Sequence, residues 1–209
     1  MKINENLVKY IEEEIFPSYA KNDLGHNLEH IKYVIDRSLK FAKTVPDINY
    51  DMVYLIAAYH DIGHYIDAKN HAKISADMLL KDEKLNDFFD NNQITIMAEA
   101  VEDHSSTINK EPRNIYGKIV ASADKPTSID NAILRTYNYT VKHNPYFGFE
   151  EVIEASRQHL FDKFGSKGYG VKKMYFEDLD YIHFINGLAD LTSDKSKFKE
   201  RFINIVTMN

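Results

Sequence analysis

The chain of 209 residues has a mass of 24.3 kDa, contains nine histidines and no cysteine, and carries a net charge of −6. The absence of cysteine excludes disulfides, iron–sulfur clusters and thiolate sites, so any metal site must use histidine and carboxylate ligands. The acidic charge balance argues against a protein that binds a nucleic-acid duplex.

Apolar residues recur at spacings of three and four along most of the chain, which predicts an all-α fold, a helical bundle. In chain order, the predicted helices cover residues 7–15, 26–44, 50–62, 74–80, 94–101, 114–124, a stretch starting at Pro126, 149–164, 177–191 and 198–206. Pro17 is expected to end the first helix. The segment FINIVT in the last predicted helix could also form a strand, but a single strand has nothing to pair with.

The helix predicted at 50–62 is apolar nearly all round, which is typical of a buried central helix. Its longest apolar run, Met52 to Tyr59, is much shorter than the about 20 residues that a membrane-spanning helix needs. Acidic residues interrupt the apolar stretch at the amino terminus, unlike in a signal peptide. We therefore expect a cytoplasmic protein without membrane contact, folded as a single domain over 1–209. The oligomeric state stays open, with a homodimer as one option.

Two histidine pairs stand four residues apart, His26 with His30 and His60 with His64. Residues i and i+4 lie on one helix face, so either pair could share a metal ion. The first pair lies in H-x-x-E-H, and the second resembles H-E-x-x-H with Asp61 in place of glutamate; both are patterns of zinc proteases. A protease needs only one such motif, and the second has a glycine in mid-helix and lacks the glutamate, so proteolysis is disfavoured.

A longer ordered set explains these histidines better. A histidine in HIKYV is followed by the dipeptide HD in AAYHDIGH, by histidines in NHAKISADMLL and AVEDHSS, and by an aspartate in VASADKP. Over residues 23–130 this order resembles the HD-domain superfamily, metal-dependent phosphohydrolases with an all-helical core. Residues 131–209 carry no motif, and we expect them to be helical and to complete the core and the pocket.

The resemblance implies that one divalent ion is held by four residues: His30, His60, Asp61 and Asp124. Asp61 follows a run of eight apolar residues and a histidine, and a charge there is costly unless it is paired or coordinated. Some members hold a second ion with two further histidines, which here would be His71 and His104; the alternatives are that these two contact a phosphate or cap helix ends. Such ligands accept Mn, Fe, Ni, Co, Zn or Mg.

His60 and Asp61 are adjacent, so on a regular helix their side chains point about 100° apart. One ion can bind both only near a helix end or in a distorted turn, and Gly63 is expected to supply the flexibility. Asp124 could instead cap a helix that starts at Pro126.

His26 and His64 each lie one turn from a proposed ligand. Many superfamily members have lysine at the position of His64, and a histidine there could donate a proton near neutral pH or support a ligand. The predicted catalytic residues are Asp61, His64 and Lys125. The predicted substrate contacts are His26, Arg113 and Lys118, although lone basic residues are more often solvated.

The resemblance therefore predicts hydrolysis of a phosphoester or phosphoanhydride in a small phosphorylated molecule, with nucleotides among the candidates. A divalent ion would polarise a phosphoryl oxygen and activate water for in-line attack. Two alternatives remain: a dinuclear-iron oxygenase on the same fold, and a non-catalytic nucleotide-binding signalling module.

Overall fold

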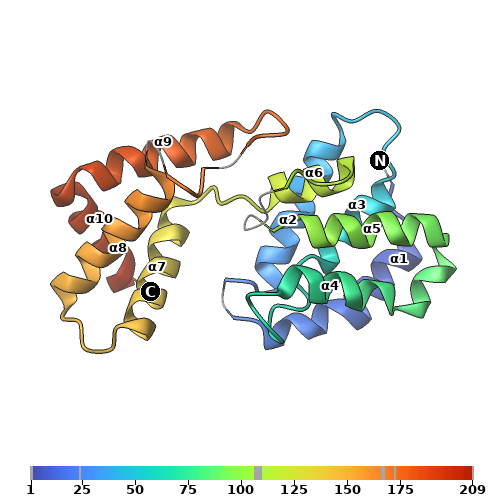
Figure 1. Ribbon diagram of the computed structural model, residues 1–209, viewed down its shortest axis with the longest axis horizontal. Coiled ribbons are helices and arrows are strands. Elements are labelled where there is room, and N and C mark those ends of the chain that lie inside the picture. The colour runs from blue at the N-terminus through green and yellow to red at the C-terminus, as the bar shows by residue number, and fades with distance from the viewer. Residues whose placement is uncertain (1, 24, 106–109, 166–167, 172, 209) are drawn as a thin grey trace. The chain divides into compact units, whose positions relative to one another are not determined.

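The computed structural model describes residues 2–23, 25–105, 110–165, 168–171 and 173–208 (Figure 1). Within these ranges the chain is helical and contains no strand, so the predicted all-α class is confirmed. The chain forms two compact units, Met1–Asp124 and Lys125–Asn209. That it folds as a single domain stays a prediction. None of the described helices is long and apolar enough to span a membrane.

The described residues of the first unit form six α-helices and three shorter helical segments, which are called turns below. The α-helices are α1 (Glu5–Tyr10), α2 (Leu28–Ala42), α3 (Tyr50–Tyr59), α4 (His71–Leu80), α5 (Asn91–Asp103) and α6 (Ile115–Ala123). The turns are the π-helix η1 (Ile11–Ile15) and the 3-10 helices η2 (Phe16–Lys21) and η3 (Glu83–Asp87).

The amino-terminal segment differs from its prediction. Pro17 was expected to end a helix, but the chain continues through η1 and η2 to Lys21. Pro17 lies in the first turn of η2, where a backbone N–H would have no helical partner in any case. The proline therefore lies at the start of a tighter helical turn rather than at the end of the helical segment.

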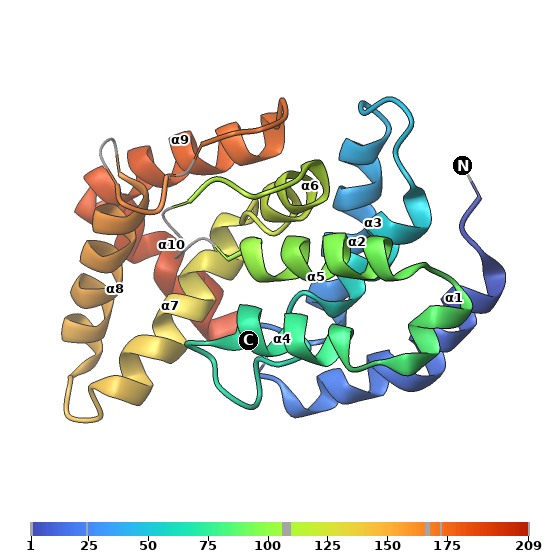
Figure 2. The same ribbon diagram turned by 45° about the vertical axis from the view of Figure 1, so that its right-hand side comes forward.

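The central helix of the first unit is α3, as its apolar sequence predicts. All its residues from Met52 to Tyr59 are buried. Helix α2 packs against α3 and α6, and α5 packs against α3, α4 and α6 (Figures 1 and 2). Because these helices surround α3, residues at its carboxyl end lie close to the ends of its neighbours.

The second unit contains α7 (Ile129–His143), α8 (Phe149–Phe164), α9 (Leu179–Ser193) and α10 (Lys195–Met208). Helix α8 packs against α7 and α9, and α10 packs against all three. The segment FINIVT lies within α10, and Phe202 is fully buried there with Phe184 and Phe198. Its apolar residues therefore belong to a helix face of a second, aromatic core.

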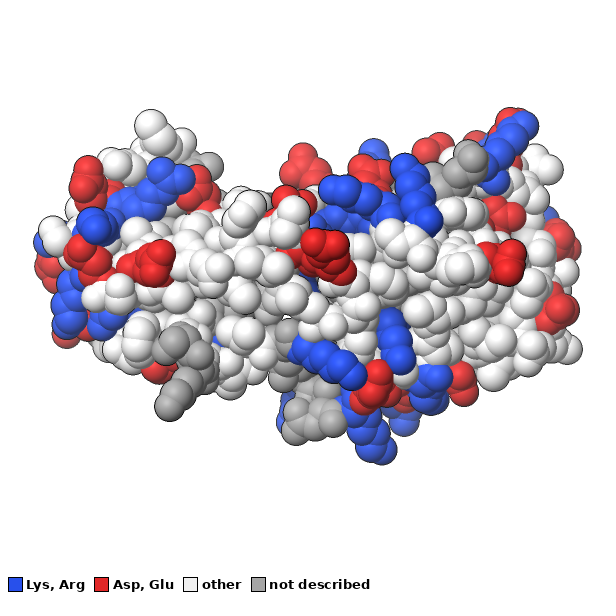
Figure 3. All heavy atoms as spheres, turned by 90° about the horizontal axis from the view of Figure 1, so that it is seen from above, with Lys and Arg blue, Asp and Glu red and all other residues white. Residues whose placement is uncertain are grey.

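Charged side chains of both signs are interspersed over the face drawn in Figure 3. This distribution accords with a chain that has 26 basic and 32 acidic residues.

Candidate metal centre

The six predicted metal ligands lie together in the first unit, each at or beside a helix end. His30 is in the first turn of α2, and His71 is the first residue of α4. The residues that directly follow the ends of α3, α5 and α6 are His60, His104 and Asp124. Asp61 comes directly after His60. Asp124 is thus a carboxyl-terminal cap rather than the amino-terminal cap that Pro126 suggested.

The carboxylate of Asp61 lies between two groups of histidines. Its Oδ2 is 3.2 Å from Nε2 of His60 and 3.7 Å from Nε2 of His30. Its Oδ1 is 3.3 Å from Nε2 of His71 and 3.4 Å from Nε2 of His104. Only 3% of the Asp61 side chain is exposed. One buried carboxylate therefore offers an oxygen to each pair of imidazoles.

Asp124 completes the first of these groups. Its Oδ1 is 3.1 Å from Nε2 of His30 and 3.9 Å from Nε2 of His60. Ligands at about 2.1 Å from one tetrahedral ion are about 3.4 Å apart. The separations around His30, His60, Asp61 and Asp124 are therefore close to those of a coordination sphere.

The orientation of three imidazoles is fixed by the same kind of hydrogen bond. In His60, His71 and His104, Nδ1–H donates to the backbone carbonyl three residues earlier, at 2.7, 2.8 and 2.6 Å. This bond selects the tautomer in which Nε2 carries the lone pair. Each ring therefore turns a metal-binding nitrogen towards Asp61.

Several of these atoms lack the partner that their burial requires. Among the described residues, Nε2 of His30, Nε2 of His60 and Oδ1 of Asp61 are buried and form no hydrogen bond of acceptable angle. Nε2 of His71 and Nε2 of His104 are 3.3 Å apart, with both Nδ1 atoms already donating to carbonyls. Two lone pairs at this distance need a proton or a cation between them. The residues present therefore fit a divalent metal.

The positive charge of His30 and the negative charges of Asp61 and Asp124 stabilise one another. Burial alone would lower the pKa of His30, but the carboxylates of Asp124 and Asp61 outweigh it and raise this pKa to about 9. Burial would raise the pKa of Asp124, but His30 lowers it to about 2. The pKa of Asp61 is held well below its ordinary value by His60 and its neighbours, against the effect of burial. Both carboxylates are thus ionised at neutral pH.

Arg37, which the sequence did not single out, holds the end of α6 in place. It is a buried residue of α2, and its Nε donates to the carbonyl of Ala123 at 3.0 Å, with Nη2 donating to that of Ser122 at 3.4 Å. These are the two residues before Asp124. Arg37 therefore ties the helix that carries His30 to the backbone that carries Asp124.

The segment HDIGH forms a series of turns after α3, as the adjacent ligands require. Gly63 does not adopt the left-handed conformation that would favour glycine, and its role in flexibility stays a prediction. A Cβ at this position would lie 2.7 Å from Cγ2 of Ile74 and 2.9 Å from the backbone nitrogen of Ser75. Gly63 is therefore required for the close approach of α4, whose first residue is His71.

The predicted catalytic His64 and substrate-contacting His26 lie against each other. Their rings are stacked, with centroids 3.7 Å apart and planes at 21°. The ring of His26 is 6.0 Å from that of His30, and the ring of His64 is 5.5 Å from that of His71. Both residues thus adjoin the candidate metal centre.

Two predicted substrate contacts are engaged with acidic side chains. Arg113 donates to Asp103 at 2.8 Å and pairs with Glu102 at the end of α5. Lys118 lies 3.0 Å from Glu111. A role for Arg113 and Lys118 in substrate binding stays a prediction, and it would require these pairs to open.

The predicted catalytic Lys125 begins the second unit. Its Nζ donates to the carbonyl of Lys173 at 2.7 Å and lies 4.7 Å from the ring centroid of Tyr181. A catalytic role for Lys125 stays a prediction.

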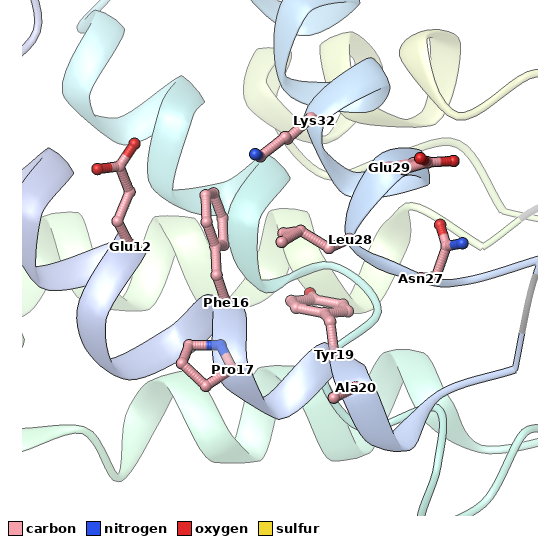
Figure 4. Close-up of a pocket in the computed structure, with 9 residues that line it drawn as sticks. All are labelled: Glu12, Phe16, Pro17, Tyr19, Ala20, Asn27, Leu28, Glu29 and Lys32. Carbon is pink, nitrogen blue, oxygen red and sulfur yellow. The ribbon is translucent and has the colours of Figure 1, made fainter.

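A groove of about 580 Å³ lies between η1, η2 and the start of α2 (Figure 4). Apolar side chains such as Phe16, Pro17 and Leu28 line it, together with the charged Glu12 and Lys32. None of the six predicted ligands lines this groove. The groove is therefore separate from the candidate metal centre.

Comparison with known families agrees with the site. Residues 27–127 match the family model described as HD domain, a range that contains all six predicted ligands. No curated protein and no solved structure matches the chain in the corresponding comparisons. Residues 27–127, which carry the six predicted ligands, thus form an HD domain, and the superfamily of this domain consists of metal-binding, generally hydrolytic proteins.

Proposed function

We propose that this protein is a metal-dependent phosphohydrolase that acts on a small phosphorylated molecule. The observation that carries the proposal is the buried carboxylate of Asp61, which has imidazole nitrogens 3.2–3.4 Å from each of its oxygens. Such a set of histidine and carboxylate ligands leaves coordination positions for water and substrate.

The metal supplies the central chemistry: a bound divalent ion polarises a phosphoryl oxygen and lowers the pKa of coordinated water. His30, His60, Asp61 and Asp124 would hold this ion, and the two carboxylates would offset its charge. His71 and His104, together with Asp61, would hold a second ion.

The proton needed by the leaving group would come from His64. Its ring is 5.5 Å from that of His71, so it adjoins the ligands without being one of the six. A positioned imidazole can act as a general acid towards a leaving group. His26, stacked against it, would contact the substrate and keep the ring of His64 in place.

A metal-reconstitution assay tests this function. Metal-depleted protein is supplied with Mn, Co, Ni, Mg or Fe, and phosphate release is measured from nucleoside mono-, di- and triphosphates. We expect turnover only with metal, and we expect Asp61→Asn to reduce it to the uncatalysed background. His143→Gln is the matched control, because His143 is an exposed histidine of the second unit. Hydrolysis that survives both chelation and Asp61→Asn would show that the site assignment is wrong.

The arrangement around Asp61 also favours a second candidate, a dinuclear-iron oxygenase, because each carboxylate oxygen faces its own pair of histidines. Full hydrolytic activity of an iron-free manganese protein would exclude it. A non-catalytic nucleotide-binding module would instead bind a nucleotide with no turnover under any metal.

A further inference from the structure

A second cluster of metal-binding side chains lies beside the six predicted ligands. Asp23, His26 and His64 each offer one ligand atom, and these atoms lie within 4.8 Å of one another. The cluster combines the loop before α2 with the turn after α3. Its histidines are partly buried and its carboxylate is exposed, so it is open to solvent.

The geometry of this cluster already brings unlike ligands together. Nδ1–H of His26 donates to Oδ1 of Asp23 at 2.7 Å. The ring of His64 is stacked on that of His26 at a centroid distance of 3.7 Å. Because the stacked rings are nearly parallel, the nitrogen lone pairs in their planes run side by side, and the rings must tilt for a nitrogen of each to bind one ion together with the carboxylate.

One asparagine fixes the two segments of the cluster to each other. Nδ2 of Asn22 donates to the carbonyls of His26 and Asp61, both at 3.0 Å. Oδ1 of Asn22 accepts from the backbone N–H of Tyr65 at 3.0 Å. This side chain therefore holds the loop that carries Asp23 and His26 against the turn that carries His64.

We infer that, in the absence of substrate, Asp23, His26 and His64 form a separate binding site for a transition-metal dication such as Zn²⁺ or Co²⁺. Two imidazoles and one carboxylate are the ligands of many open zinc sites, in which water takes the fourth position. Two nitrogen ligands favour such an ion over Mg²⁺ or Ca²⁺, which prefer oxygen. The contact between His26 and Asp23 opens to about 3.4 Å when both bind one ion.

The exposure of this cluster sets its expected affinity. The side chain of Asp23 is 61% exposed, whereas that of Asp61 is 3% exposed. Water competes more strongly with an exposed carboxylate, so we expect this site to bind its ion more weakly than the Asp61 site. A titration should therefore show a separate, later phase.

Equilibrium dialysis against Co²⁺ tests the inference, because it counts the bound ions per chain without requiring activity. The wild type is compared with His26→Gln and His64→Gln, with His143→Gln as the matched control. Visible absorption of bound Co²⁺ reports its ligands, and circular dichroism verifies that each variant is folded. We expect both variants to bind one ion fewer than the wild type and the control, and to lose the weaker phase.

An unchanged ion count in folded His26→Gln and His64→Gln would overturn the inference. A further variant, Asp61→Asn, separates it from the proposed function. We expect folded Asp61→Asn to retain one bound Co²⁺ held by Asp23, His26 and His64, and the absence of any bound ion would also overturn it. Loss of hydrolysis in Asp61→Asn bears on the proposed function alone.

Discussion

At the scale of single residues, the orientation of the imidazoles decides what the site can bind. The backbone carbonyl three residues before His60 or His104 belongs to the last turn of a helix and accepts from Nδ1–H. A histidine just after a helix end can therefore satisfy one nitrogen locally and present the other to a metal. The sequence identifies these histidines, but the nitrogen that each presents depends on the three-dimensional structure.

The raised pKa of His30 predicts that metal binding depends on pH. The metal-free protein holds a proton on this ring below pH 9, because its pKa is raised to about 9 by Asp124 and Asp61 against the effect of burial. An ion must displace that proton, so the apparent affinity should rise about tenfold for each pH unit between about 6.5 and 8.5. Competition with a chelating dye at several pH values measures it, and a flat profile would contradict the assignment of His30.

The same shift predicts the opposite trend for the stability of the metal-free protein. A group whose pKa is raised in the folded state stabilises that state most below its unfolded pKa, here about 6.5. The contribution of His30 should therefore be lost as the pH rises from about 6.5 to 9. Urea unfolding of chelator-treated wild type and His30→Gln should show free energies that differ most at the acid end of this window. An equal difference at both ends would refute the linkage.

At the scale of secondary-structure elements, helix ends carry the candidate site, and the sequence predicted their positions to within a few residues. The helix at 149–164 is as expected, whereas the central helix, predicted to extend to residue 62, ends at Tyr59, so that His60 and Asp61 follow it. Apolar periodicity predicts helices well because each buries one face in a core. The same pattern could not predict that Pro17 continues the helical path, since this depends on how η2 packs.

Features that depend on contacts between distant segments could not be predicted from the sequence. In the sequence, Arg37 resembles any other basic residue of an amphipathic helix. Only the folded structure brings it to the backbone carbonyls of α6. Asp23 stands three residues before His26, but only folding brings His64 to the pair. The sequence predicts flexibility at Gly63, but it cannot show that Ile74 lies too close for any larger side chain at this position.

The packing of α4 predicts that Gly63→Ala is destabilising. The added methyl group would lie 2.7–2.9 Å from atoms of Ile74 and Ser75, so α4 must shift. Overpacking of this kind costs about 1–3 kcal/mol. We expect a lower urea midpoint and weaker metal binding, because His71 begins the displaced helix.

Gly148→Ala is the matched control for this prediction. A Cβ at Gly148 would lie 3.5 Å from Oε2 of Glu151, which is ordinary contact, and the residue is exposed. Gly148 is the N-cap residue of α8, where alanine is less favourable than glycine, so we expect a cost of at most about 1 kcal/mol, smaller than that of Gly63→Ala. Equal effects of the two substitutions would mean that the approach of α4 to Gly63 does not matter.

At the scale of the whole molecule, all six predicted ligands belong to one of the two compact units. They come from α2, α4 and the residues that follow α3, α5 and α6. An ion that binds only the folded arrangement stabilises it in proportion to its affinity and concentration. Metal binding should therefore increase the free energy of unfolding of the first unit as a whole.

Hydrogen exchange measured by mass spectrometry tests this at the level of peptides. Saturating Mn²⁺ should slow amide exchange in peptides from α2 to α6 and leave peptides from α7 to α10 unchanged. The Asp61→Asn protein should lose the protection of peptides from α4, α5 and α6 under the same conditions. Protection confined to the second unit would be incompatible with the proposed ligands.

The position of the bound metal tests the central claim most directly. Anomalous diffraction from crystals grown with Mn²⁺ locates the ion without reference to activity. We predict a peak about 2.2 Å from Nε2 of His30 and His60 and from carboxylate oxygens of Asp61 and Asp124. Manganese-dependent hydrolysis by protein whose crystals show no peak between these four side chains would contradict the account.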